Sequence, residues 1–318
     1  RSQSRVFLIP LLFLSFGIWA QQSSVSPYSK GGAGDIQSQN YFRAIGFAGA
    51  NIALPEPINI NVTNPASYNA LELTTFEIGG KLTLLDQQQS DPNVSIKNNI
   101  SGMQYFSFGL PLTPWWGSAI GVQPYTFKGY DINTNRLGPD SIGISDQFEG
   151  DGGLTRMYWG HAFRIARGLS AGFNSSLIFG SLEENQGVVW ESAANNSIIN
   201  ENATIRGLKF DYGIRYKMQA KNKHEMSFGL TYANQTSLKS VVDKEAYTTN
   251  NNGVPVDTLK TISGYQSNLT LPNEFGFGWS YGKLTVDPVR NYSWAISTDF
   301  HFYQGSNFES YNGLKNQS

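Results

Sequence analysis

From Leu73 onward, large apolar residues alternate with small or charged residues. In FGFGWSYG (275–282) every second residue is aromatic, and the residues between them are glycine or serine. The segments FDYGIRYK (210–217), MSFGLTYA (226–233) and WAISTDFHF (294–302) follow a similar alternation. Because successive side chains of a strand point to opposite faces of a sheet, the pattern predicts strands with one large apolar face and one small or polar face.

This alternation predicts nine strands. Their ranges are roughly 73–86, 100–111, 117–130, 154–165, 169–183, 204–218, 224–239, 263–284 and 292–304. Leu271 and Pro272 interrupt the eighth strand, which indicates a kink within one long strand. Gln123 and Pro124 shift the alternation in the third strand, which indicates a bulge.

A soluble β-sandwich also shows alternation, but three features favour a membrane barrel. Many segments exceed the ~9–11 residues that cross a bilayer at a tilt. Short connections alternate with long ones, the long ones lying near 86–99, 131–153, 183–203 and 239–262, as in outer-membrane barrels. Tryptophan and tyrosine recur near segment ends, where an interfacial girdle lies: Trp115, Trp116, Tyr130, Trp190 and Trp294.

The predicted fold class is therefore all-β, a transmembrane antiparallel β-barrel. Single-chain bacterial barrels have even strand counts. The nine strands end before a polar stretch that runs to Ser318. We therefore expect the C-terminal strands of the barrel to be missing from this sequence.

The first twenty residues have the composition of an export signal. Arg1 and Arg5 precede the apolar run 6–20, and Ala20 is a plausible cleavage point. A single transmembrane anchor is the alternative, although the run is shorter than the ~20 residues of a spanning helix. The sequence thus predicts export from the cytoplasm. The region 26–69 that follows is rich in Gly, Pro and Asn and has no sustained period.

Composition narrows the function classes. The 318 residues carry a net charge of -1 and only 15% charged residues, which argues against a nucleic-acid partner. The chain has no Cys, which excludes disulfides and thiolate metal sites. Aromatic content of 14% and mean hydropathy of -0.32 are typical of a β protein with one apolar and one polar face.

Two stretches resemble a known family when their order along the chain is considered. TNPASYNAL (63–71) precedes the strands, and a Leu-Pro strand (271–282) is followed by a Trp-led strand (294–302). This order resembles the FadL family of outer-membrane transporters for long-chain fatty acids and other hydrophobic compounds. The resemblance implies a 14-stranded barrel when complete, an even count typical of bacterial barrels. It also implies an N-terminal hatch inside the lumen, closed by Asn64, Pro65 and Ala66.

The resemblance implies passive uptake of hydrophobic molecules such as fatty acids by a monomer in contact with outer-membrane lipid. The implied division is a signal peptide at 1–20, a hatch at 21–71 and the barrel at 72–318. For the segment around Asn64 the alternative is a plain periplasmic extension before the first strand. For the whole chain, the alternatives are a scaffold or carrier for secreted proteins at the outer membrane, or a general porin.

Apolar hatch residues are candidates for a ligand pocket, although packing of the plug against the wall explains them as well. These residues are Phe42, Ile45, Phe47, Ile52 and Leu54. Basic residues at lumen-facing positions either hold a carboxylate or pair with hatch acids such as Asp35. These residues are Lys81, Arg156, Arg164, Arg215 and Lys217.

Catalytic, metal and cofactor sites are not expected. Residues 168–172 match G-x-S-x-G, but they fall at a hairpin turn and not at a strand-turn-helix elbow. Asp131 begins a pattern similar to a calcium loop, but Ile142 occupies the position of the bidentate glutamate. An enzyme is therefore not predicted.

Overall fold

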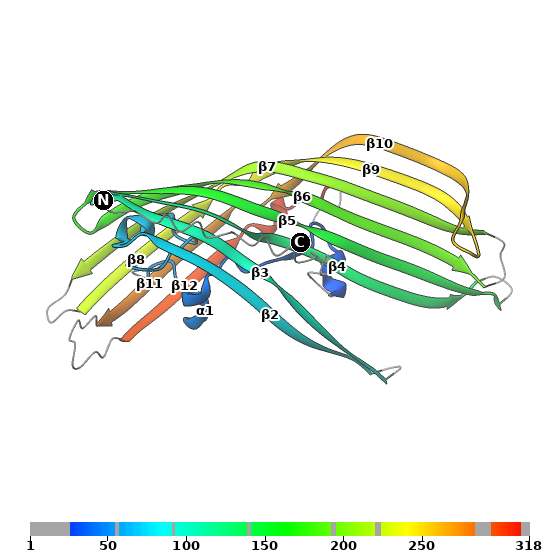
Figure 1. Cartoon of the computed structure of the whole chain (residues 1–318), viewed down its shortest axis with the longest axis horizontal. Helices are drawn as coiled ribbons and strands as arrows, with labels where there is room; N and C mark the ends of the chain where they lie inside the picture. Colours follow the sequence, from blue (N-terminus) through cyan, green and yellow to red (C-terminus); the bar gives the residue numbers. More distant parts are fainter. Residues whose placement is uncertain are drawn as a thin grey trace, which may run out of the picture.

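The computed structural model describes residues 26–54, 57–90, 93–138, 141–191, 195–219, 224–283 and 294–312. The described chain is all-β, with twelve antiparallel strands in one sheet that curls into an open half-barrel (Figure 1). The strands are β1 (Asp35–Ile36), β2 (Thr75–Ser90), β3 (Asn93–Thr113), β4 (Trp116–Leu137), β5 (Gly143–Ala166), β6 (Leu169–Trp190), β7 (Asn195–Gln219), β8 (His224–Ala233), β9 (Thr236–Asn250), β10 (Pro255–Leu271), β11 (Glu274–Lys283) and β12 (Trp294–Tyr303). Short helices are η1 (Pro27–Lys30), α1 (Phe42–Gly46), η2 (Pro65–Ala70) and η5 (Gly305–Asn307).

The sheet order is β12-β11-β8-β7-β6-β5-β4-β3-β2. The long strand β7 pairs with β8 over Asp211–Gln219 and with β9 over Asn195–Arg206. Strands β8 and β9 are therefore successive parts of one row of the sheet. Strands β11 and β10 pair with β8 and β9 respectively, so they form the next row. Counted by rows, the main sheet agrees with the nine predicted strands.

Two local features of the strands were predicted and one was missed. Strand β10 ends at Leu271, and Pro272 lies in the gap before β11. The pairing of β4 with β5 shifts register between Pro124 and Thr126, which confirms the bulge. The break between β8 and β9, at residues 234–235, was not predicted.

The predicted long loops were wrong. Strands β4 and β5 stay paired as far as Leu137 and Gly143, and β6 and β7 stay paired as far as Val188 and Ser197. The polar residues there have low strand propensity, but a continuous hydrogen-bonded ladder holds them in extended conformation. Figure 1 shows these hairpins projecting together toward one end of the sheet.

A closed barrel is not seen among the described residues, and the 14 strands implied by the resemblance are not reached there. Within these ranges the sheet ends at β2 on one side and at β12 on the other, and the two edge strands do not pair. Closure requires every edge to be paired, which this set of strands does not achieve.

One face of the sheet, here called the outer face, is apolar across all nine rows. The register aligns Phe106, Val122, Met157, Leu177 and Leu208 from strand to strand. The register also aligns Tyr212, Tyr232, Phe275 and Phe302 across four neighbouring strands. Most of these side chains are exposed. The alternation therefore predicted this face correctly.

The opposite face, here called the inner face, carries the core. One cluster lies under the ends of the described chain and includes Ala33, Leu154, Ile178, Leu238 and Tyr311. A second lies under residues 41–68 and includes Tyr41, Ile60, Tyr68, Tyr105 and Tyr158. Both terminal parts of the described chain thus pack against the inner face. Among the described helices, none is long and apolar enough to cross a bilayer.

Candidate functional site

Residues 41–54 and 57–71, here called the inner segment, are fixed to the sheet around Asn64. The side chain of Asn64 caps η2, since its Oδ1 accepts a hydrogen bond from the N–H of Ala66 at 3.1 Å. Its Nδ2 donates to the Ile52 carbonyl at 2.7 Å and to the Ile214 carbonyl of β7 at 3.3 Å. Pro65 follows as the first helical residue, where its fixed φ and missing N–H suit a helix start.

Strand glycines form the floor under this segment. A Cβ on Gly213 would lie 2.1 Å from Asn64 Oδ1, and one on Gly172 would lie 2.7 Å from the Pro65 carbonyl. Gly172 and Gly213 are direct register partners on β6 and β7. A Cβ on Gly117 or on Gly229 would meet backbone atoms of Tyr68 or Ile52. The inner segment therefore lies directly on the backbone of the sheet.

Polar contacts attach the inner segment to both edge strands. Asp299 of β12 accepts hydrogen bonds from the N–H groups of Asn51 at 2.6 Å and Ile52 at 2.8 Å. Glu77 of β2 accepts one from the N–H of Ile60 at 2.6 Å. Hydrogen bonds to charged groups are stronger than neutral ones. The inner segment thus spans the half-barrel from one edge to the other.

A tyrosine cluster secures the same segment to the middle of the sheet. The rings of Tyr41 and Tyr105 stack with centroids 3.8 Å apart. The hydroxyls of Tyr41 and Tyr158 lie 2.9 Å apart, and the Tyr68 hydroxyl donates to Asn174 Oδ1 at 2.9 Å. Burial raises the pKa of Tyr41 and of Tyr68 well above its ordinary value. Both phenols are therefore neutral at physiological pH.

The structure separates the five apolar residues predicted as a ligand pocket. Phe42 and Ile45 are exposed on α1, and Phe47 is half-buried at its end. Ile52 and Leu54 are buried in the inner segment, Ile52 against the glycines of β8 and β11. None of the five lines either of the two cavities described below.

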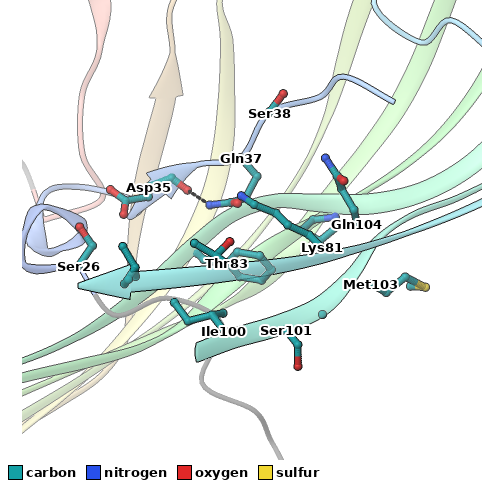
Figure 2. Close-up of a pocket in the computed structure, with 14 residues that line it drawn as sticks. Ser26, Asp35, Gln37, Ser38, Lys81, Thr83, Ile100, Ser101, Met103 and Gln104 are labelled. Atoms are coloured by element: carbon teal, nitrogen blue, oxygen red, sulfur yellow. Dashed lines mark hydrogen bonds between the residues drawn. The ribbon is translucent and has the colours of Figure 1, made fainter. Parts of the chain in front are cut away.

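The inward-facing basic residues divide between ion pairs and cavities. Arg156 pairs with Asp211 of β7 at 2.5 Å, and Lys209 pairs with the same carboxylate. Lys217 pairs with Glu225 at 2.7 Å. Lys81 instead lines a cavity of about 290 Å³ together with Asp35. Figure 2 shows this cavity between the segment that carries β1 and strands β2 and β3.

A larger cavity of about 1180 Å³ lies at the end of the sheet where the short turns gather. The inner segment contributes Pro57 and residues 69–71, Glu72 follows directly after it, and the sheet contributes the ends of β3 and β5–β8. Its basic lining residues are Arg164, Arg167, Arg215 and Lys217, and its acidic ones are Glu72 and Glu225. The sequence had indicated three of these basic residues as inward-facing, but it had not joined them into one site.

The partners of the inner segment on the sheet could not be recognised from the sequence. Asn174, Asp299 and Glu77 stand in ordinary alternating strand positions, which do not distinguish them from other polar residues of the inner face. The alternating glycines were the available signal. Glycine weakens a strand interior unless another backbone approaches closely.

An antiparallel sheet with an apolar outer face and a covered inner face is the construction typical of an outer-membrane β protein. The chain matches the family model described as BamG over residues 4–318, and it therefore belongs to the BamG family. A comparison with curated proteins finds no match.

Membership of the BamG family corrects the resemblance to FadL. BamG denotes a component of the BAM complex, which assembles outer-membrane proteins. The family assignment to FadL and the predicted uptake of fatty acids were therefore wrong. The outer-membrane location is retained, because the BamG family is associated with that membrane. The predicted signal peptide at 1–20 lies outside the described residues.

Proposed function

We propose that this chain is a non-enzymatic component of the outer-membrane protein assembly machinery. The observation that carries the proposal is the match to the BamG family over residues 4–318. That match extends over nearly the whole chain. It is therefore stronger support than a short motif such as Asn64-Pro65-Ala66, which encodes a local helix cap.

The outer face supports contact with the hydrocarbon of the membrane. Contiguous apolar patches above a few hundred Å² mark protein or membrane contacts. Here exposed apolar side chains occur on the outer face from β2 to β12, Phe76 and Phe302 being 58% and 65% exposed. Outer-membrane lipid is the partner that this face suits.

The inner segment supports a structural role for the chain. It covers the inner face between Glu77 and Asp299, and residues 308–311 cover a further part near Leu154. In this role the segment holds the edges of the half-barrel at a set separation. The other components of the machinery can then contact the outer face of the folded sheet and the end of the sheet where the short turns gather, here called the turn end.

Co-purification tests the proposal. The gene product would be tagged in its own bacterium, extracted from outer membranes in mild detergent and analysed by mass spectrometry. We expect components of the assembly machinery at near-equal amounts. Recovery of the chain without any of these components, while an independently tagged component recovers the rest of the complex, would contradict the proposal.

A further inference from the structure

The cavity at the turn end is large and lies between two parts of the fold. Its volume of about 1180 Å³ exceeds the roughly 300–1,000 Å³ of small-ligand pockets. Its walls come from residues 69–72, at the end of the inner segment and just after it, and from strand ends that are far apart in the sequence. A chain segment fits such a volume better than a small metabolite does.

The lining has an excess of positive charge. Arg164 and Arg215 both register with Ser170 of β6, so the two arginines flank one serine on the inner face. Directly opposite residues of neighbouring strands lie about 4.5–5.5 Å apart. Arg167 joins them from the adjoining turn. Lys217 is neutralised by Glu225 at 2.7 Å, whereas Arg164 and Arg167 have no ion pair with any described residue.

Two residues of the lining also have a buried acceptor atom without a donor. Asn69 is 9% exposed, and in the described structure its Oδ1 has no hydrogen-bond donor. Glu225 is likewise 9% exposed, and its Oε2 receives no donor there. Buried acceptors of this kind are costly when they stay unsatisfied. The phosphodiester of a lipid headgroup supplies acceptors for the arginines but no donor for these two oxygens.

We propose that this cavity binds an acidic peptide segment of a partner protein. Carboxylates of the peptide pair with Arg164 and Arg167, since arginine binds carboxylates in bidentate geometry. Backbone N–H groups of the peptide donate to Asn69 Oδ1 and Glu225 Oε2. The choice of a protein ligand rests on the proposed function, whereas the charge and the acceptors come from the cavity itself.

The test uses the purified full chain in detergent and a fluorescent ten-residue peptide that alternates Glu with Ser. A peptide of equal length that alternates Lys with Ser is the comparison ligand. The variant R164E/R167E reverses two exposed charges of the cavity. The control K97E/K260E makes the same change in net charge at exposed residues of β3 and β10, outside the cavity.

We expect the acidic peptide to bind and the basic peptide not to bind. The affinity should fall at least tenfold in R164E/R167E and less than twofold in K97E/K260E, with circular dichroism unchanged in both. Equal binding by both variants would overturn the site. Full competition by millimolar inorganic phosphate or by anionic phospholipid vesicles would overturn the peptide as the ligand. If the wild-type chain co-purifies with the machinery but does not bind the acidic peptide, this inference fails and the proposed function stands. If the chain does not co-purify, the proposed function fails whatever the peptide does.

Discussion

Replacing Gly213 by alanine tests how closely the inner segment is packed on the sheet. Alanine in place of a strand glycine ordinarily stabilises a protein by roughly 0.5–1 kcal/mol. Here the added Cβ would lie 2.1 Å from Asn64 Oδ1 and 2.9 Å from Pro65 Cδ. Asn64 must therefore move, and the backbone of η2 must move with it. The packing thus predicts the opposite sign for an otherwise favourable substitution.

The size of the effect follows from the contacts that Asn64 makes. Its displacement removes the partner of the Ala66 N–H at 3.1 Å and of the Ile52 carbonyl at 2.7 Å. Each buried group left without a partner costs about 1–3 kcal/mol. We expect Gly213→Ala to destabilise the packed state of the inner segment by about 2–4 kcal/mol. This is less than two full penalties, because neighbouring atoms can shift and restore part of the lost contacts. Opening of the segment should then rise about 30-fold to several hundred-fold.

Chymotrypsin cleavage after Tyr68 measures this opening, because Tyr68 is fully buried in the packed segment. Mass spectrometry would follow the fragment that begins at Asn69. The matched control is Gly102→Ala in β3, where an added Cβ would have no neighbour within 4 Å. The combination of Asn64→Ala with Gly213→Ala should cost less than the sum of the single changes, by about 1 kcal/mol or more. Cleavage of Gly213→Ala at the rates of the wild type and of Gly102→Ala would refute the close packing.

Three further predictions follow from the inner face. Asp211→Asn should destabilise the fold by about 3–5 kcal/mol in thermal or urea unfolding, because it leaves the buried Arg156 without its carboxylate. Asp146→Asn, at an exposed ion pair, should have a much smaller effect, and equal losses in the two variants would contradict the argument. Asp299→Ala should raise cleavage after Tyr68 about tenfold or more, because two N–H groups lose their shared acceptor. Asp257→Ala on the exposed strand β10 is the control. Equal cleavage of both variants would count against the attachment of the inner segment to β12. The packed inner segment should lose stability as pH rises above the ordinary phenol pKa of 10.0. Tyr41 and Tyr68 have raised pKa values and stay neutral when buried, whereas the same phenols ionise once the segment is released. The stability that the two buried phenols contribute is therefore complete below pH 10.0 and is lost above it. Tryptophan fluorescence and tyrosinate absorbance between neutral and alkaline pH would follow the change, and a transition unchanged by Tyr68→Phe would rule out a role for Tyr68.

The alternation predicted the faces of the sheet well, because a period of two has a direct geometric meaning. It placed Phe275 and Phe277 on the outer face and Gly276 and Gly278 on the inner face, as the register shows. Pro272 also marked a break for a local reason, because proline has no N–H to donate to the hydrogen-bond ladder. The break at residues 234–235 has no such marker and was missed.

Features that depend on pairing between distant residues were beyond the sequence. Residues 131–137 have a composition typical of loops, yet they pair with 143–149 and extend β4. The arginines of the turn-end cavity come from separate hairpins, so only the folded sheet brings Arg164 and Arg215 to the same serine.

The resemblance to FadL failed because its motifs describe packing and not function. Asn64 and Pro65 begin a capped 3₁₀ helix that lies on glycines, a local solution that any covered β-sheet can use. Such a motif shows how the segment folds. It does not show what the protein transports or assembles.

Depletion of the chain in its own bacterium tests the central claim most directly. The newly made barrel proteins would be followed by pulse labelling, and their insertion measured as folded, protease-resistant protein in the outer membrane. Membership of the assembly machinery predicts that this insertion slows as the chain is lost, and that re-expression restores it. Normal insertion of every barrel protein after complete depletion would contradict the account.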